Sequence, residues 1–162
     1  MADVAHRAGV SRQTLYNSFG ARRELARAYV EREAERFLAA VDVAVREHAE
    51  RPHEALAAAL EVFLATAAEH PLVRAIVSAE GGDELLALVT TRGGPLIARA
   101  SGHLRALLVG TWPALAPADA EAIAETLVRL AISHAALPLR DPAATARQVA
   151  GILGPCVDEL LG

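Results

Sequence analysis

"GVSRQTLYNSFGARRELA", residues 9–26, is the most basic and most polar part of a chain that is otherwise apolar and acidic. Gly9 can adopt the left-handed backbone conformation that ends a helix, and Ser11 is a good N-cap for the helix that follows. Gly20 ends this second helix, which we expect over about residues 12–18. Two short helices, joined by a tight glycine turn and capped by serine, predict a helix-turn-helix.

The second of these helices carries side chains that suit the major groove of DNA. That groove is about 12 Å wide and admits a helix whose outward side chains are polar and of moderate length. We expect Arg12, Gln13 and Asn17 to bond to base edges. Thr14 would meet a thymine methyl group or a phosphate, and Tyr16 would pack while its hydroxyl reaches the DNA backbone.

Charge is unevenly distributed along the chain. The first 23 residues hold four arginines and one aspartate, a net charge of +3, whereas the remainder carries −7. A basic end on an acidic body predicts that only this end meets a polyanion. Arg22 and Arg23 begin a long helix, where free backbone amides also attract phosphate.

The rest of the chain is predicted to be helical throughout, so the fold class is all-α. Apolar residues make up 53% of the 162, alanine and leucine dominate, and no alternating strand pattern occurs. From apolar periodicity, prolines and glycine turns we expect further helices at about 21–48, 52–69, 71–79, 83–90, 95–109, 118–137 and 142–161.

The segment "DVAHRAGVSRQTLYNSFGARREL", residues 3–25, strongly resembles the DNA-binding motif of the TetR family of transcriptional repressors. The resemblance covers about 25 residues and is specific. The residues that match the family pattern are Asp3, Val4, Ala5, Ala8, Gly9, Val10, Ser11, Leu15, Tyr16, Phe19, Gly20, Arg22 and Leu25.

Two positions depart from the family pattern. A serine usually caps the long helix, and Ala21 stands there instead, so we expect a cap weaker by about 1 kcal/mol. Family members also have a whole helix before the position of Met1, and this sequence lacks it. We therefore expect an incomplete DNA-binding head, in which Val4, Leu15 and Phe19 are poorly covered.

The resemblance implies a ligand-responsive transcriptional regulator, usually a repressor, which binds palindromic operator DNA as a dimer and is released by a small effector. It implies a truncated helix-turn-helix region at 1–26 and an effector-binding and dimerisation domain at 27–162. The residues expected at the DNA are Ser11, Arg12, Gln13, Thr14, Tyr16, Asn17 and Arg22.

The last two predicted helices are the expected dimer surface. The final helix has apolar residues on more than one side, so one side would meet its own body and the other a second subunit in a four-helix bundle. The residues expected at this surface are Leu127, Leu130, Leu137, Val149, Ile152, Leu153, Cys156 and Leu160. A monomeric helical core is the plainer interpretation of the same pattern.

An effector pocket is expected among the helices between residues 56 and 134. An apolar lining with a few polar groups predicts a lipophilic effector. The expected lining residues are Phe63, Ile76, Leu88, Ile97, His103, Leu104, Leu108, Trp112 and His134. Arg74 and Arg105 are further candidates for its polar contact. Ordinary core packing is the alternative role for each apolar residue, and a partly exposed or hydrogen-bonded structural role is the alternative for each histidine.

Other function classes receive little support. The sequence contains no nucleophile elbow, phosphate-binding loop or zinc spacing, so we expect neither an enzyme, nor a metal, nor a cofactor. It has one cysteine, no signal peptide and no long uncharged apolar run, which predicts a cytoplasmic protein without a membrane span. The alternative function is a helical ligand-binding or interaction module that no longer binds DNA.

Overall fold

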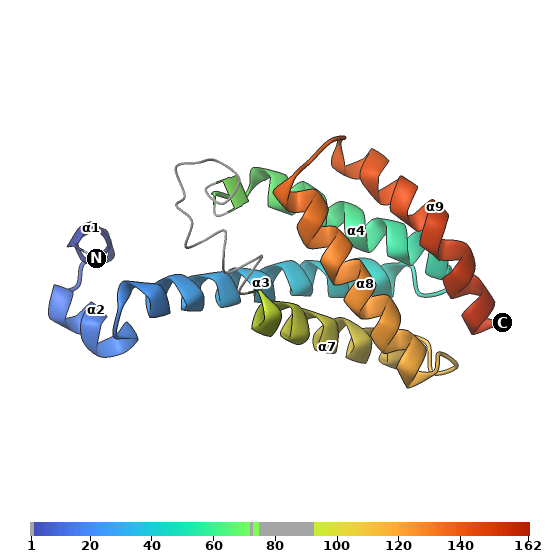
Figure 1. Ribbon diagram of the computed structural model, residues 1–162, viewed down its shortest axis with the longest axis horizontal. Helices are drawn as coiled ribbons and strands as arrows, with labels where there is room; N and C mark the ends of the chain where they lie inside the picture. Colours follow the sequence, from blue (N-terminus) through green and yellow to red (C-terminus); the bar gives the residue numbers. More distant parts are fainter. Residues whose placement is uncertain (1, 72, 75–92) are drawn as a thin grey trace. The chain divides into compact units, whose positions relative to one another are not determined.

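The computed structural model describes residues 2–71, 73–74 and 93–162, apart from the side chains of Arg22 and Arg23. Within these residues the chain is helical and contains no strand, which confirms the all-α prediction (Figure 1). The short helices expected at 71–79 and 83–90 lie almost entirely outside the described residues. None of the described helices is long and apolar enough to cross a membrane.

Backbone contacts divide the chain into two units, Met1–Glu33 and Ala34–Gly162. Helix α3, residues Arg22–Glu47, begins in the first unit and ends in the second. The expected domain boundary near residue 26 stays a prediction, because no break in the helix marks it.

The first unit begins with two short helices, α1 (Ala2–Ala8) and α2 (Arg12–Phe19). Gly9 and Gly20 follow them with φ of +66° and +68°, a region of backbone conformation that favours glycine. Ser11 caps α2 as expected, since its Oγ accepts a hydrogen bond from the backbone N–H of Thr14 at 3.0 Å. The predicted helix-turn-helix is therefore present.

The interior of this unit is small, because its helices are short. Ala5 of α1 and Leu15 of α2 are buried, and the two helices contact each other. Val4 is 42% exposed, as expected, and Phe19 is partly buried. The expectation of poor cover is wrong for Leu15, because the turn at Gly9 folds the helices onto one another and encloses this side chain.

The start of α3 is capped by a glutamate rather than by the missing serine. The backbone N–H of Ala21 donates a hydrogen bond to Glu24 Oε2 at 3.2 Å. This contact is one half of a capping box, in which a glutamate at the third helical position reaches back to the capping residue. The cap is therefore weaker than a complete one but is not absent.

The second unit contains the later part of α3 and four further helices, α4 (Pro52–Glu69), α7 (Gly94–Thr111), α8 (Pro117–Ala136) and α9 (Pro142–Leu161). Each of the four has a proline in its first turn, where the missing N–H costs no intrahelical bond. Asp141 also caps α9 by accepting from the backbone N–H of Ala144 at 2.8 Å.

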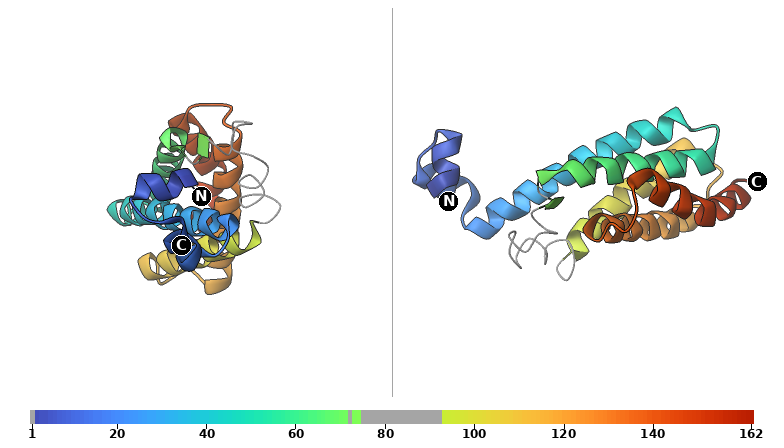
Figure 2. Two further views of the ribbon diagram at one scale, coloured as in Figure 1. Left: turned by 90° about the vertical axis from the view of Figure 1, so that its left-hand side faces the viewer. Right: turned by 90° about the horizontal axis from the view of Figure 1, so that it is seen from above.

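Packing in this unit follows two main pairs, α4 with α9 and α7 with α8, and α4 also contacts α8 (Figures 1 and 2). Helices α8 and α9 run in opposite directions, as expected from the short connection between them. The principal partner of α9 is α4, however, and not α8. All five helices and the loop before α8 contribute to the core, which contains Val41, Val45, Leu56, Leu60, Leu64, Leu104, Leu107, Leu108, Leu115, Ala120, Ala124, Leu127, Val128, Ala146, Val149 and Ala150.

Candidate functional site

The polar side chains of α2 are displayed to solvent, as recognition of DNA requires. Arg12, Gln13, Thr14, Tyr16 and Asn17 are all exposed, while Leu15 between them is buried. Helix α2 thus presents a polar face to solvent, and Leu15 is its one buried side chain. The side chain of Arg22 lies outside the described part of the structure.

Two side-chain contacts order this polar face. Gln13 Nε2 donates to Asn17 Oδ1 at 2.9 Å, one helical turn further along. The hydroxyls of Ser11 and Thr14 lie 2.8 Å apart, in addition to the cap bond between these residues. The amide pair is therefore pre-arranged on the exposed side of α2, whereas Ser11 is engaged in capping the helix.

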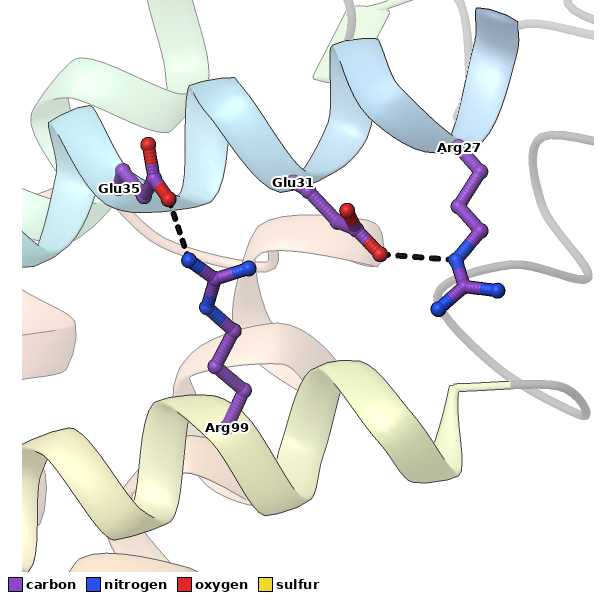
Figure 3. Close-up of polar contacts among 4 residues, drawn as sticks. All are labelled: Arg27, Glu31, Glu35 and Arg99. Atoms are coloured by element: carbon purple, nitrogen blue, oxygen red, sulfur yellow. Dashed lines mark hydrogen bonds and ion pairs between the residues drawn. The ribbon is translucent and has the colours of Figure 1, made fainter. Parts of the chain in front are cut away.

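Ion pairs lie along α3 within each unit (Figure 3). In the first unit Arg27 Nε lies 2.8 Å from Glu31 Oε1, one turn away on the same helix. In the second unit Arg99 of α7 pairs with Glu35 of α3. Both pairs are exposed, so each contributes little to stability, on the order of 0–1 kcal/mol.

The expected effector residues fall into three groups. Leu104 and Leu108 are buried in the core of the second unit, and Phe63, Ile97 and Trp112 pack against that core while partly buried. His103 and His134 do not share one environment, because His103 is exposed and His134 is half-buried on α8. The remaining two, Ile76 and Leu88, lie outside the described residues.

The polar groups of His103 and Trp112 are already bonded to other parts of the unit. His103 Nε2 lies 2.7 Å from Asp42 Oδ1 of α3, at the surface. Trp112 Nε1 donates to the carbonyl oxygen of Ala49 at 2.7 Å. Each of these two groups therefore already has one hydrogen-bond partner within the second unit.

Ser101 of α7 is not among the predicted site residues. Its Oγ is buried and, within the described part of the chain, is the one buried side-chain polar atom without a hydrogen-bond partner. The sequence does contain the signal. Ser101 occupies the apolar stripe formed by Ile97, Leu104 and Leu108, at steps of three and four residues.

The expected dimer residues divide between surface and core. Ile152 is 69% exposed and Leu137 67% exposed, and Cys156 and Leu160 are exposed as well. Leu130 and Leu153 are partly buried, whereas Leu127 and Val149 belong to the core of the subunit. Four of the eight expected residues are thus exposed, and they lie on α9 and at the residue that follows α8.

No metal centre is formed by the residues that the structure describes. Among them, no three His, Cys, Asp or Glu side chains come together as metal ligands would. The single cysteine, Cys156, is exposed and free.

Comparisons with known proteins agree on one family. A family model described as "Bacterial Tetracyclin repressor, C-terminal domain" matches residues 52–155. The "HTH-type transcriptional regulator AlkX" of Mycobacterium tuberculosis is 34% identical over 155 residues, which cover 96% of this chain and 74% of that protein.

A solved structure extends the similarity to the fold. The crystal structure of the TetR family repressor AlkX from a Dietzia species, implicated in biodegradation of n-alkanes, superposes with a TM-score of 0.86 at 35% identity. The match covers 99% of this chain and 87% of that one, so it includes the helix-turn-helix as well as the body.

Proposed function

This chain belongs to the TetR family of transcriptional regulators, and we propose that it is a repressor whose dimer binds palindromic operator DNA and leaves it when a lipophilic effector enters the body. The single observation that carries the proposal is the exposed polar face of α2. Arg12, Gln13 and Asn17 all point to solvent on a helix that is capped at Ser11 and buried only through Leu15.

The proposed contacts with DNA are of two kinds. Arg12, Gln13 and Asn17 would bond to base edges, because guanidinium and amide groups match the donors and acceptors of the major groove. Tyr16 and Thr14 would contact phosphate and sugar, with Arg22 at the start of α3, and these contacts position the helix without reading sequence. Ser11 would contribute indirectly, because its cap stabilises the helix that carries these DNA contacts.

Dimerisation is proposed through the exposed apolar surface of α8 and α9. Leu137, Ile152, Cys156 and Leu160 would otherwise remain in water, and burying them against a second copy is favourable. Two heads in a symmetric dimer would read half-sites about 34–36 Å apart, one turn of DNA. A single head has few contacts, so affinity depends steeply on the pairing.

The proposed effector is a long apolar molecule. The described residues around the expected site are mainly aliphatic and aromatic, including Phe63, Ile97, Leu104, Leu108 and Trp112. The similar Dietzia repressor is implicated in the biodegradation of n-alkanes. By similarity we propose an alkane-derived compound as the effector. We also propose that the protein acts in the cytoplasm, where the chromosome lies.

The alternative, a ligand-binding module that does not bind DNA, is not favoured. Both similar proteins bear the names of transcriptional regulators, and the head residues that such a module would not need are present and exposed. Because both similar proteins are named as regulators, the similarity also favours a regulator over an enzyme.

The experiment is a fluorescence-anisotropy titration of the full-length natural protein with duplex DNA from upstream of its own gene, containing an inverted repeat. We expect sequence-selective binding that weakens as salt rises, because phosphate contacts release counterions. Addition of a medium-chain alkane or alkanol should release the DNA. Binding that is neither selective nor sensitive to salt would refute the proposed function.

A further inference from the structure

Ser101 carries a buried polar atom that the fold does not use. Its Oγ is buried in the middle of α7 and, among the residues that the structure describes, has no hydrogen-bond partner. A buried hydroxyl left unpaired is unfavourable, because it has lost its bonds to water and gained none in return. Such an atom requires an explanation, either in the packing or in something that the site binds.

The side chain faces the interior of the body. Ile97, Leu104 and Leu108 occupy the same stripe of α7, four residues before Ser101 and three and seven after it, and all three belong to or pack against the core. The hydroxyl therefore lies on the apolar side of the helix and not on its solvent side.

The hydroxyl is also not satisfied by its own helix. Thr66 of α4 shows the ordinary local solution, in which Oγ1 donates to the carbonyl oxygen of Val62 four residues earlier, at 2.7 Å. The corresponding bond from Ser101 to Ile97 is absent. The hydrogen-bonding capacity of Ser101 thus remains directed into the body.

The charged side chains of α7 are directed elsewhere. Arg99 pairs with Glu35 and His103 bonds to Asp42, both on α3, while Arg105 is exposed. The described part of α7 therefore offers the interior one neutral hydroxyl and no cation. An ionised head group buried at this point would find no opposite charge on α7, whereas an uncharged one needs only a hydrogen bond.

We propose that Ser101 Oγ is the polar contact for the effector, which would be an elongated apolar molecule with one uncharged hydrogen-bonding group, of the class of a primary alcohol. A serine hydroxyl both donates and accepts, and so does an alcohol. This inference rests on the proposed function, because it assigns the polar contact within the same effector site.

The test compares three ten-carbon ligands that differ in their head group. Operator-bound protein, followed by fluorescence anisotropy, is titrated with 1-decanol, with decane and with decanoate, for the natural chain and for Ser101→Ala. Ser133→Ala is the matched control, since Ser133 is exposed on α8. Thermal unfolding of each variant without ligand is measured alongside.

We expect Ser101→Ala to raise the concentration of 1-decanol needed for half-release by about two- to tenfold, the usual effect of losing one hydrogen bond. The response to decane should not weaken, and Ser133→Ala should behave as the natural chain does. Without ligand, Ser101→Ala should unfold at an equal or higher temperature, because it removes an unpaired buried group.

Three results would overturn the inference alone. Equal responses of the natural chain and Ser101→Ala to 1-decanol would show that the hydroxyl does not touch the effector. A lower unfolding temperature for Ser101→Ala would assign the hydroxyl to a structural partner. Release that depends on Ser101 only with decanoate would exclude a neutral head group. A natural chain that responds to none of the three ligands would instead contradict the effector class in the proposed function, and this inference with it.

Discussion

A Cβ atom placed on Gly154 of α9 would lie 2.3 Å from Nδ1 of His53 on α4, so the His53 ring occupies space that a side chain at residue 154 would need. Gly154 is buried, and the same imidazole nitrogen lies 3.7 Å from Asp158 Oδ2 one turn further along α9. The contact joins the two helices that form the largest interface of the second unit.

The first prediction concerns this contact. Gly154→Ala should lower the free energy of unfolding by about 1–3 kcal/mol, because the added methyl group displaces the His53 ring and separates α4 from α9. Gly102→Ala is the control, since Gly102 is exposed on α7 with open space around it. The control should gain about 0.5–1 kcal/mol from higher helix propensity. Urea denaturation followed by circular dichroism measures both, and a gain in both variants would contradict the role of Gly154.

The second prediction concerns His103, which the sequence places in the effector site and the structure places beside Asp42. Their side chains are 41% and 27% exposed, so the contact should be worth at most about 1 kcal/mol. His103→Ala should therefore reduce stability only slightly and leave effector-induced release from DNA unchanged. A double-mutant cycle with Asp42→Ala measures the interaction. If His103→Ala, but not Asp42→Ala, strongly reduced effector-induced release, His103 would belong to the effector site.

The third prediction separates base recognition from simple attraction to DNA. Gln13→Ala and Asn17→Ala should each reduce discrimination between operator and single-base variants by about 1–3 kcal/mol, because these amides would bond to base edges. Either change also breaks the hydrogen bond between the two side chains. Binding to a set of single-base operator variants is the measurement. Equal weakening on every sequence would mean that the residues touch only the DNA backbone.

The fourth prediction concerns the dimer surface. Ile152→Asp should shift the protein towards monomers in sedimentation experiments and weaken operator binding, because a carboxylate would be buried in the subunit contact. Val43→Asp is the matched control, since Val43 is 56% exposed and belongs to α3 rather than to α8 or α9. Val43→Asp should form the same fraction of dimer as the natural chain. Loss of association in both variants, or in neither, would argue against this surface.

Local signals in the sequence were sufficient for the head and for the limits of most helices. Ser11, Gly9 and Gly20 define α1 and α2 because capping and left-handed backbone geometry act over three or four residues. The expected limits of α4 and α9, residues 52–69 and 142–161, agree with the structure because a proline opens each helix. These interactions are short in range, so a linear sequence contains them.

The direction in which each side chain of the body points was decided by the tertiary structure alone. Leu127 and Ile152 look alike in an apolar periodicity, yet the first is in the core and the second faces solvent. His103 is a candidate polar contact for the effector and lies at the surface with Asp42, whereas Ser101, which is not among the predicted site residues, has a buried hydroxyl. A helical period determines which residues share a face, but what covers that face depends on contacts between residues far apart in the chain, such as that of His53 with Gly154.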